Sequence, residues 1–442
     1  MKTSSQTSAS FDQFVGQLHI AIEQPTMADQ VHIDVPRLLD GAAAEAVKTL
    51  LPLNYRQQHG IFFSGHEIAT LAATQLFSSL VAGKTVFDPA CGAGDLLLAA
   101  ARQMPLQKNL IATIQNWTQV IGGCDIHNEF VQATRMRLFL LARSRHIERG
   151  DINASVLFQS WMFSQIECLD YLKSKSAGRD YSCIIANPPF GYVKVPKKCS
   201  WSTGQTQLAA VFLDAIVERS HPTQHIVAIL PDVLRSGSRY GRWRGQICER
   251  SSHVEVLPYG RFDEQTDVDV FLLDIKATDQ SLDKASVAWP SFHNASDSQQ
   301  TSNRLRDKYE VRIGSVVPHR LTKRGKWAPY LCVKTAPPFS ETTPTNRLRF
   351  TGTLFHPPFL VIRRTSNPAD EHRIIPTIVR GENPVAVENH LIAIFPKSND
   401  LSSCISLFKH LTSPQTRNWI DNAIRCRHIT KQILLELPIG DI

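Results

Sequence analysis

The chain has 442 residues, of which 43% are hydrophobic and 20% charged, which is enough for two or three soluble domains with cores of their own. It contains no apolar run of about 18 residues, and its N-terminus MKTSSQTSASFDQF lacks the apolar core of a signal peptide, so we expect a cytoplasmic protein without a membrane span. The nine cysteines include no CxxC pair, which argues against a zinc ribbon, and no metal site is expected.

The charge is distributed unevenly. Residues 283–442 contain 22 Lys and Arg against 13 Asp and Glu, whereas residues 1–282 contain 26 and 27. The net charge of +8 therefore comes entirely from the C-terminal third. A near-neutral body with a basic extension is typical of a catalytic domain joined to a domain that binds a polyanion, although a merely solvated basic surface has the same composition.

The elements predicted along the chain indicate three regions. Residues 1–60 show helical patterns and are expected to form a helical segment. Between 61 and 282, short apolar strands alternate with helices, which predicts a doubly wound α/β sheet. The segment 276–303 is rich in Ser, Asp, Asn and Gln and is expected to be a linker. The basic region 283–442 contains β-leaning segments and a late helix, expected at 417–427.

Seven strands are expected in the central region. Their ranges are 84–90, 120–126, 154–160, 181–187, 225–231, 254–259 and 268–276. Helices are expected between them at 94–104, 128–146 and 205–221.

The first stretch that carries chemistry is TVFDPACGAGDLLLAAAR at 85–102. A strand ends at Asp88, a turn with Gly92 and Gly94 follows, and a helix opens near Asp95. Glycines let the backbone approach a ligand, and the first N–H groups of a helix point toward it. The run DPACGAG is neither the three-glycine dinucleotide fingerprint nor a phosphate-binding loop. We expect a cofactor site that does not bind a nucleotide phosphate, with a purely structural turn as the alternative.

The second stretch is VIGGCDIHNEF at 120–130, where a strand ends at Asp125. A carboxylate at this position can accept hydrogen bonds from ribose hydroxyls, as in dinucleotide-binding folds. An exposed acid at a strand end is common, but its place one strand–helix unit after the glycine turn favours the ribose role.

The third stretch is YSCIIANPPFGYV at 181–193, an apolar strand that runs into two prolines. The side-chain oxygen of Asn187 and the carbonyl of Pro188 can serve as two adjacent acceptors, while Pro189 stiffens the turn and Phe190 offers a ring face. Two acceptors and a ring suit the exocyclic amino group of a planar base. Accepting both amino hydrogens leaves the nitrogen lone pair less delocalised, so it can attack an electrophile without a strong general base.

In this order, DPACGAG, GCDI and ANPPFG resemble the N6-adenine DNA methyltransferases of the gamma class, which occur in restriction-modification and related anti-phage systems. The resemblance implies a seven-strand, Rossmann-like S-adenosylmethionine-dependent methyltransferase sheet and a target adenine flipped out of duplex DNA. It implies that the adenine is gripped by the catalytic residues Asn187, Pro188, Pro189 and Phe190. It further implies that the S-adenosylmethionine site includes Asp88, Pro89, Ala90, Cys91, Gly92, Gly94, Asp125, Ile126 and Asn187.

Two further stretches extend the resemblance to the cofactor walls. The run 55–76 is similar to the family's entry motif, which places Phe63 and Ser64 beside the methionine end of the cofactor, although the usual Thr-Pro is Ser64-Gly65 here. After the third strand the family often has an acidic residue against the cofactor adenine. The expected strand 154–160 is followed by no such acid, and Ser160 and Trp161 are expected at that wall instead.

The resemblance also implies that residues 283–442 form a target-recognition domain. Its basic runs HRLTKRGKWAPYL at 319–331 and PPFLVIRRTS at 357–366 mix cations with aromatic rings, which suits phosphates and base edges. A lysine-bearing loop after the catalytic turn could also close over DNA. The expected DNA contacts are Lys194, Lys197, Lys198, Arg320, Lys323, Arg324, Arg363 and Arg364.

The sequence contains no recognisable nuclease motif, so any cleavage is expected to belong to a partner, either a cognate restriction endonuclease or an assembly with a specificity subunit. Two alternatives stay open. A methyltransferase of the same fold could act on RNA or on a protein glutamine, although those enzymes more often carry Tyr after the two prolines. An inactive DNA-binding scaffold is the third hypothesis, supported by the altered entry motif and by the missing acid after the expected third strand.

Overall fold

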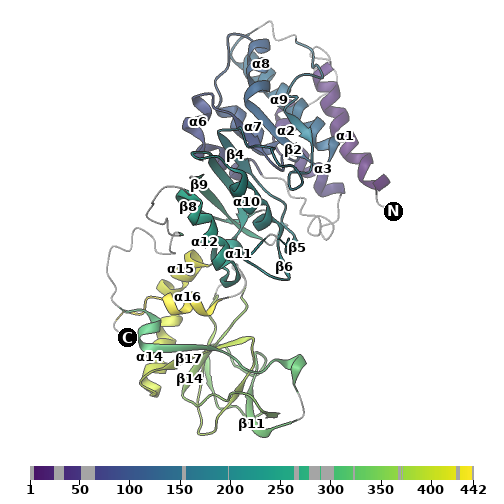
Figure 1. The fold of residues 1–442 in the computed structure, drawn as a ribbon. Helices are drawn as coiled ribbons and strands as arrows, with labels where there is room; N and C mark the ends of the chain where they lie inside the picture. The colour runs from purple at the N-terminus through teal and green to yellow at the C-terminus, as the bar shows by residue number, and fades with distance from the viewer. Residues whose placement is uncertain are drawn as a thin grey trace. The chain divides into compact units, whose positions relative to one another are not determined.

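The computed structural model describes residues 4–23, 34–50, 65–151, 156–197, 199–262, 268–277, 289, 303–321, 324–366, 370, 372–424 and 429–440 (Figure 1). The chain divides into two compact units. The first covers 1–235 and 239–290, and the second covers 236–238 and 291–442. Within the ranges described, no helix has the length and apolar character that a membrane span requires.

The first unit contains a seven-stranded sheet in the order β3-β2-β1-β4-β7-β9-β8. All neighbouring strands from β3 to β7 run parallel, whereas β9 runs antiparallel to both β7 and β8. The parallel strands are short apolar runs with both faces covered, as in β7, where every residue after His225 is buried. The predicted fold class is confirmed. The strands are β1 (Val86–Asp88), β2 (Ile121–Asp125), β3 (Ile166–Cys168), β4 (Cys183–Ala186), β7 (His225–Pro231), β8 (Ser251–Arg261) and β9 (Asp269–Ala277).

Helices follow the parallel strands because each crossover must return to the same end of the sheet. Helices α5, α7 and α9 pack side by side, while α10 packs on β7 and on α12. The helices of this part are α5 (His66–Gln75), α6 (Phe77–Val81), α7 (Asp95–Gln103), α8 (Leu110–Val120), α9 (Asn128–Glu148), α10 (Leu208–Arg219), α11 (Asp232–Ser236), η1 (Ser238–Tyr240) and α12 (Gly241–Glu249). A hairpin of β5 (Tyr192–Lys194) and β6 (Gln205–Gln207) precedes α10.

One predicted strand is wrong. The described part of 154–160, residues 156–160, is irregular, and the third strand is β3, which starts at Ile166. The run VLF at 156–158 has the apolar residues of a strand, whereas β3 buries only Ile166 and exposes Glu167 and Cys168. An edge strand needs only one covered position, so its sequence signal is weak.

The N-terminal helices share the core of the first unit. They are α1 (Ser4–Glu23), α2 (Val35–Leu39) and α3 (Ala42–Leu50). Phe11 and Phe14 of α1 are buried in the same cluster as the sheet. Arg143 of α9 donates to the carbonyls of Ala21 and Ile22, and so supplies partners to the last carbonyls of α1. The helical character expected for 1–60 is therefore present over the described residues.

The second unit is built on a five-stranded sheet in the order β10-β17-β14-β15-β12 and a three-stranded sheet in the order β13-β11-β16. The strands are β10 (Tyr309–Ile313), β11 (Lys326–Leu331), β12 (Ser340–Thr342), β13 (Arg347–Phe350), β14 (Phe359–Arg363), β15 (Pro376–Val379), β16 (Ala386–Val387) and β17 (Leu391–Pro396). The helices are α13 (Leu305–Lys308), η2 (Pro318–Arg320), α14 (Leu401–Leu411), α15 (Pro414–Ala423) and α16 (Lys431–Glu436).

The alternation of side chains along β14 explains the layers of this unit. Leu360 and Ile362 belong to a core with α14, α15 and α16, whereas Phe359 and Val361 belong to a second core with Leu331 of β11. The five-stranded sheet thus has helices on one face and the three-stranded sheet on the other. The late helix expected at 417–427 is α15, and the linker expected at 276–303 lies almost wholly outside the described residues.

Candidate functional site

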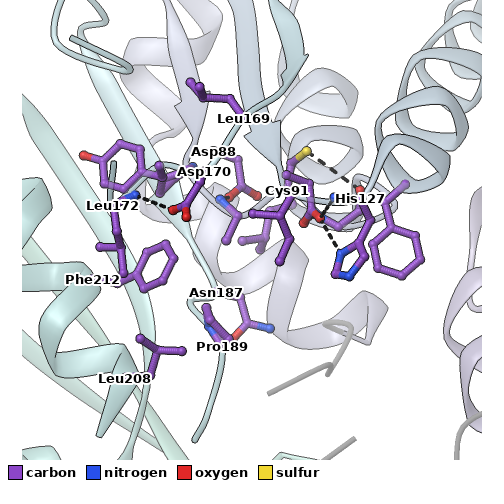
Figure 2. A pocket seen from close by; sticks show the side chains of 18 of the residues that line it. Asp88, Cys91, His127, Leu169, Asp170, Leu172, Asn187, Pro189, Leu208 and Phe212 are labelled. Carbon is purple, nitrogen blue, oxygen red and sulfur yellow. Dashed lines mark hydrogen bonds and ion pairs between the residues drawn. The ribbon is translucent and has the colours of Figure 1, made fainter. Parts of the chain in front are cut away.

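A pocket of about 280 Å³ opens at the carboxyl ends of β1, β2, β3 and β4 (Figure 2). Because these strands are parallel, the residues that follow them meet at one edge of the sheet. The polar groups of the pocket come from this edge, and α10 adds an apolar wall with Leu208 and Phe212. Its lining residues are Asp88, Pro89, Ala90, Cys91, Gly92, Asp95, Leu96, Asp125, Ile126, His127, Phe130, Leu169, Asp170, Tyr171, Leu172, Asn187, Pro189, Leu208 and Phe212.

The glycine turn between β1 and α7 has the conformation that its sequence predicts. Gly92 and Gly94 have φ angles of 52° and 94°, which a residue with a side chain adopts at a cost. A Cβ on Gly94 would lie 2.8 Å from Cγ2 of Thr134, whose Oγ1 donates to the carbonyl of Gly92 at 2.9 Å. Thr134 of α9 therefore holds the turn in place, and Gly92 lines the pocket.

Asp88 ends β1 and is buried beneath the turn. Its side chain is 1% exposed, and Oδ1 accepts a hydrogen bond from the N–H of Ala90 at 2.9 Å. Burial raises the pKa of Asp88 to about 8, and the nearby carboxylates of Asp125 and Asp95 add to the shift. At neutral pH this carboxyl group is consequently protonated in large part and can donate a hydrogen bond toward the pocket.

Asp125 ends β2 and binds both neighbouring segments. Its Oδ2 accepts from the N–H of Gly92 at 3.0 Å, and its Oδ1 accepts from the N–H of His127 at 2.9 Å. Nδ1 of His127 also lies 3.0 Å from Oδ1, and this hydrogen bond raises the pKa of His127. A carboxylate has about four acceptor positions, so at least one stays available to a ligand hydroxyl.

Asp170 follows β3 and is a site residue that the sequence reading missed. Its Oδ1 accepts from the N–H of Leu172 at 3.1 Å, and its Oδ2 lies 3.0 Å from Nζ of Lys173. An acidic residue that the sequence analysis did not find after the expected strand 154–160 is therefore present after the observed third strand. The signal available was the run LDYL after IEC, because a strand predicted at 166–168 would have placed Asp170 just after its end.

The Asn-Pro-Pro-Phe turn follows β4 directly. Asn187 and Pro189 line the pocket, as Figure 2 shows, whereas Pro188 and Phe190 are not among its lining residues. Phe190 is 6% exposed, and its ring lies edge-on to that of Phe262, with centroids 5.5 Å apart and an interplanar angle of 74°. Phe262 is a second ring at this turn that sequence reasoning did not single out.

Arg137 of α9 does not line the pocket but binds the segments that form it. The sequence analysis did not identify this residue. The guanidinium is fully buried, and Nη1 donates to the carbonyl of Ala93 at 2.6 Å and to Oδ1 of Asp95 at 2.8 Å. Nε donates to the carbonyl of Leu38 at 2.9 Å. One side chain thus joins the glycine turn, the first turn of α7 and the N-terminal helices.

The other expected cofactor residues divide into two groups. Phe63 and Ser64 lie outside the described residues. Ser160 and Trp161 do not line the pocket; both are exposed, Trp161 by 42%, because they belong to a turn that precedes β3. The acidic pocket residue that follows the third strand is Asp170.

The expected DNA contacts lie in both units. Lys194 and Lys197 are exposed on the hairpin β5–β6 and the loop that follows β5, while Lys198 lies outside the described residues. In the second unit Arg324 is exposed, and Arg363 and Arg364 are half-buried at the end of β14. Lys323 and the side chain of Arg320 are not described. Among the described residues, no group of three or more His, Cys, Asp and Glu is placed to hold a metal ion.

One solved structure supports the fold, and two more distant ones are similar to the chain to a lower degree. The DNA complex of the type IIL restriction-modification enzyme MmeI matches with a TM-score of 0.53 and 12% identity over 89% of this chain and 70% of that one. The type IIG restriction endonuclease BpuSI matches with a TM-score of 0.47 and 14% identity over 90% of this chain, which spans 61% of that enzyme. A putative class I S-adenosylmethionine-dependent methyltransferase from Listeria monocytogenes matches with a TM-score of 0.42 and 13% identity over 65% and 88% of the two chains.

Comparison of sequences identifies the family. None of the curated proteins compared matches the chain. The family model described as N-6 DNA Methylase matches residues 51–328, well over half of the chain and the whole of the pocket. The chain therefore belongs to the N-6 DNA methylase family, as its three motifs predicted.

Proposed function

We propose that the protein transfers a methyl group from S-adenosylmethionine to N6 of an adenine flipped out of duplex DNA. The observation that carries the proposal is the place of Asn187. The side chain of Asn187 lines the same pocket as the glycine turn and as three carboxyl side chains, those of Asp88, Asp125 and Asp170. A cofactor in this pocket and a base held by Asn187 would therefore be in reach of one another.

The residues present fit S-adenosylmethionine. Asp125 retains acceptor capacity beside the turn, which suits ribose hydroxyls, and Asp170 offers a carboxylate at the neighbouring wall, which suits an adenine amino group. Gly92 lines the pocket in a backbone conformation, with φ 52°, that a residue with a side chain adopts at a cost. Leu208 and Phe212 supply apolar surface. A site with apolar walls and few polar groups is typical of small-molecule binding.

The cofactor would supply a methyl group on a positively charged sulfur, which needs only a nucleophile in line. Asn187 and the carbonyl of Pro188 would accept the two amino hydrogens of adenine and hold its nitrogen lone pair toward the pocket. Because a carbonyl acceptor does not remove a proton by itself, the amine loses its proton after transfer. Phe190 would lie against the base, and its edge-to-face contact with Phe262 fixes its ring plane in advance.

We also propose that residues 283–442 recognise the DNA target, and that the enzyme is the modification component of a restriction-modification or anti-phage system. The basic charge of this region and the presence of a second compact unit support the first part. The structural likeness to the type IIL restriction-modification enzyme MmeI supports the second part. A cognate endonuclease or a specificity subunit is the expected partner.

The test is long-read sequencing of genomic DNA from a methylation-free host that expresses the protein. We expect N6-methyladenine in one sequence context, and none with the Asn187→Ala variant. Purified protein would be assayed in parallel on duplex DNA, RNA and a glutamine-containing protein extract with labelled cofactor. Methyl transfer to RNA or protein alone would contradict the DNA substrate, and cofactor binding without transfer to any substrate would indicate an inactive scaffold.

A further inference from the structure

The second unit contains a two-stranded ribbon whose outer face is built from two arginines and a tryptophan. Strands β11 and β13 run antiparallel, with Trp327 opposite Arg349 and Pro329 opposite Arg347. Cross-strand partners point to the same side of a sheet, and so do residues two apart along a strand. Trp327, Arg347 and Arg349 therefore share one face of the ribbon, although the two strands lie about twenty residues apart in sequence.

The opposite face of the ribbon packs inward. It carries the pair Ala328 and Leu348, of which Ala328 is 3% exposed and Leu348 half-buried, and at its end the pair Lys326 and Phe350, of which Lys326 is exposed. On the outer face Trp327, Arg347 and Arg349 are exposed, Trp327 by 58%, and Pro329 is half-buried. The outer face is therefore largely open to solvent.

The charges of the outer face are of one sign. The strands read KWAPYL and RLRF and contain no acidic residue. Arg347 and Arg349 make no ion pair with any acidic side chain of the described residues. Two residues apart along a strand, they stand about 7 Å from one another. Like charges this close repel one another, and a bound anion would relieve that repulsion.

Arg349 is also held in position. Its guanidinium carbon lies 5.5 Å from the centroid of the Trp327 ring, within the range of a cation–π contact. Arg324 is exposed beside it, and both line a hollow of about 140 Å³ with Phe350 and Thr351. A guanidinium that is already oriented loses less freedom when it forms hydrogen bonds.

We propose that the outer face of the β11–β13 ribbon enters the major groove of duplex DNA and reads bases there, with Arg347 and Arg349 as the specificity-determining donors. The major groove admits a two-stranded β-ribbon, and the arginine fork matches O6 and N7 of guanine. The 7 Å spacing of the two arginines equals about two base-pair steps of 3.4 Å. The exposed ring of Trp327 would contact thymine methyl groups or sugars at the groove wall. This inference rests on the proposed DNA substrate.

The experiment uses the full-length protein and the target duplex identified by sequencing, with a scrambled duplex and a single-stranded RNA of the same sequence as competitors. The double variant Arg347→Ala/Arg349→Ala removes both guanidinium groups. The double variant Arg347→Lys/Arg349→Lys keeps the positive charges but cannot donate two parallel hydrogen bonds to one base. Lys409→Ala/Arg417→Ala is the matched control, because it removes the same charge from exposed positions of α14 and α15 on the other face of the five-stranded sheet. Unfolding midpoints and cofactor binding are measured for every variant.

We expect the alanine pair to weaken binding and methylation of the target duplex by about tenfold or more, with cofactor binding unchanged. The lysine pair should retain binding to the scrambled duplex while losing preference for the target. Target binding and methylation equal to those of the control would overturn the inference, and so would a lysine pair with full preference, since the contacts would then be to phosphates. A loss confined to RNA would also overturn it. Failure of the wild-type protein to bind or methylate any duplex would instead refute the proposed function.

Discussion

Oδ2 of Asp125 accepts a hydrogen bond from the backbone N–H of Gly92 at 3.0 Å, and this contact joins the end of β2 to the glycine turn after β1. The two motifs that the sequence presents 33 residues apart are therefore parts of one structure. A ligand bound to Asp125 would therefore lie beside the turn that Asp125 holds in place.

We expect Asp125→Asn to weaken S-adenosylmethionine binding by about 10- to 100-fold, because a hydrogen bond to a charged group contributes about 1.5–3 kcal/mol. An amide has one acceptor oxygen, so it cannot serve Gly92, His127 and a ligand hydroxyl together. Titration calorimetry measures the change. Glu129→Gln, which removes an exposed carboxylate from the first turn of α9, is the control and should bind normally. Equal losses in both variants would mean that general charge, and not this contact, matters.

Because Asp170 lines the pocket and Ser160 does not, variants at these two positions should differ in cofactor binding. Asp170→Asn should weaken cofactor binding by about tenfold, because its carboxylate lines the pocket. Ser160→Ala should leave binding unchanged, because Ser160 is exposed in the turn before β3. Both dissociation constants can be compared by the same titration. The reverse pattern would restore the interpretation made from the sequence.

The sequence predicted the parts of the site that are encoded locally. A strand, a glycine turn and a helix start within a few residues of Gly92, and the prolines after Asn187 end a strand by their covalent structure. The alternation of strands and helices then leaves few possible strand orders, because crossovers between parallel strands have one hand.

The parts that the sequence did not predict depend on contacts between distant residues. Arg137 lies in the middle of a helix, and nothing near it in the sequence indicates that it will bind Ala93 and Asp95. The pairing of Phe190 with Phe262 joins two segments by their positions in the fold. Asp170 was missed because β3 is an edge strand with one buried residue, while the more apolar run at 156–158 is irregular.

Asn187→Ala should reduce methyl transfer by about 100-fold or more while S-adenosylmethionine binding stays largely intact. The substitution removes an acceptor that is needed only when the adenine amino group is oriented for attack. Single-turnover transfer to the target duplex measures the first effect, and titration measures the second. A variant that loses cofactor binding to the same extent as activity would refute the role assigned to Asn187.

Arg137→Met should destabilise the first unit by about 3–5 kcal/mol, because it leaves Asp95 and the carbonyls of Ala93 and Leu38 without their buried donor. The methionine keeps much of the side-chain volume, so a cavity is not the cause. Arg149→Met removes an exposed arginine at the end of the same helix and should change stability by less than about 1 kcal/mol. Urea unfolding followed by circular dichroism compares the two. A similar loss of unfolding free energy in both variants would show that the buried hydrogen bonds of Arg137 do not account for the effect.

The raised pKa of Asp88 predicts a pH dependence of stability. Burial brings this pKa to about 8, whereas in the unfolded chain the carboxyl titrates near its ordinary value of about 4. Between these values the native state binds more protons than the unfolded state, so the free energy of unfolding falls as the pH rises from 4 to 8 and levels off above it. Asp88→Asn keeps an oxygen acceptor for the N–H of Ala90 and removes the titration. In thermal melts of the ligand-free protein, the variant should gain stability relative to the wild type with each step from pH 5 to pH 8. A constant difference between the two proteins over this range would mean that Asp88 is ionised in the folded state.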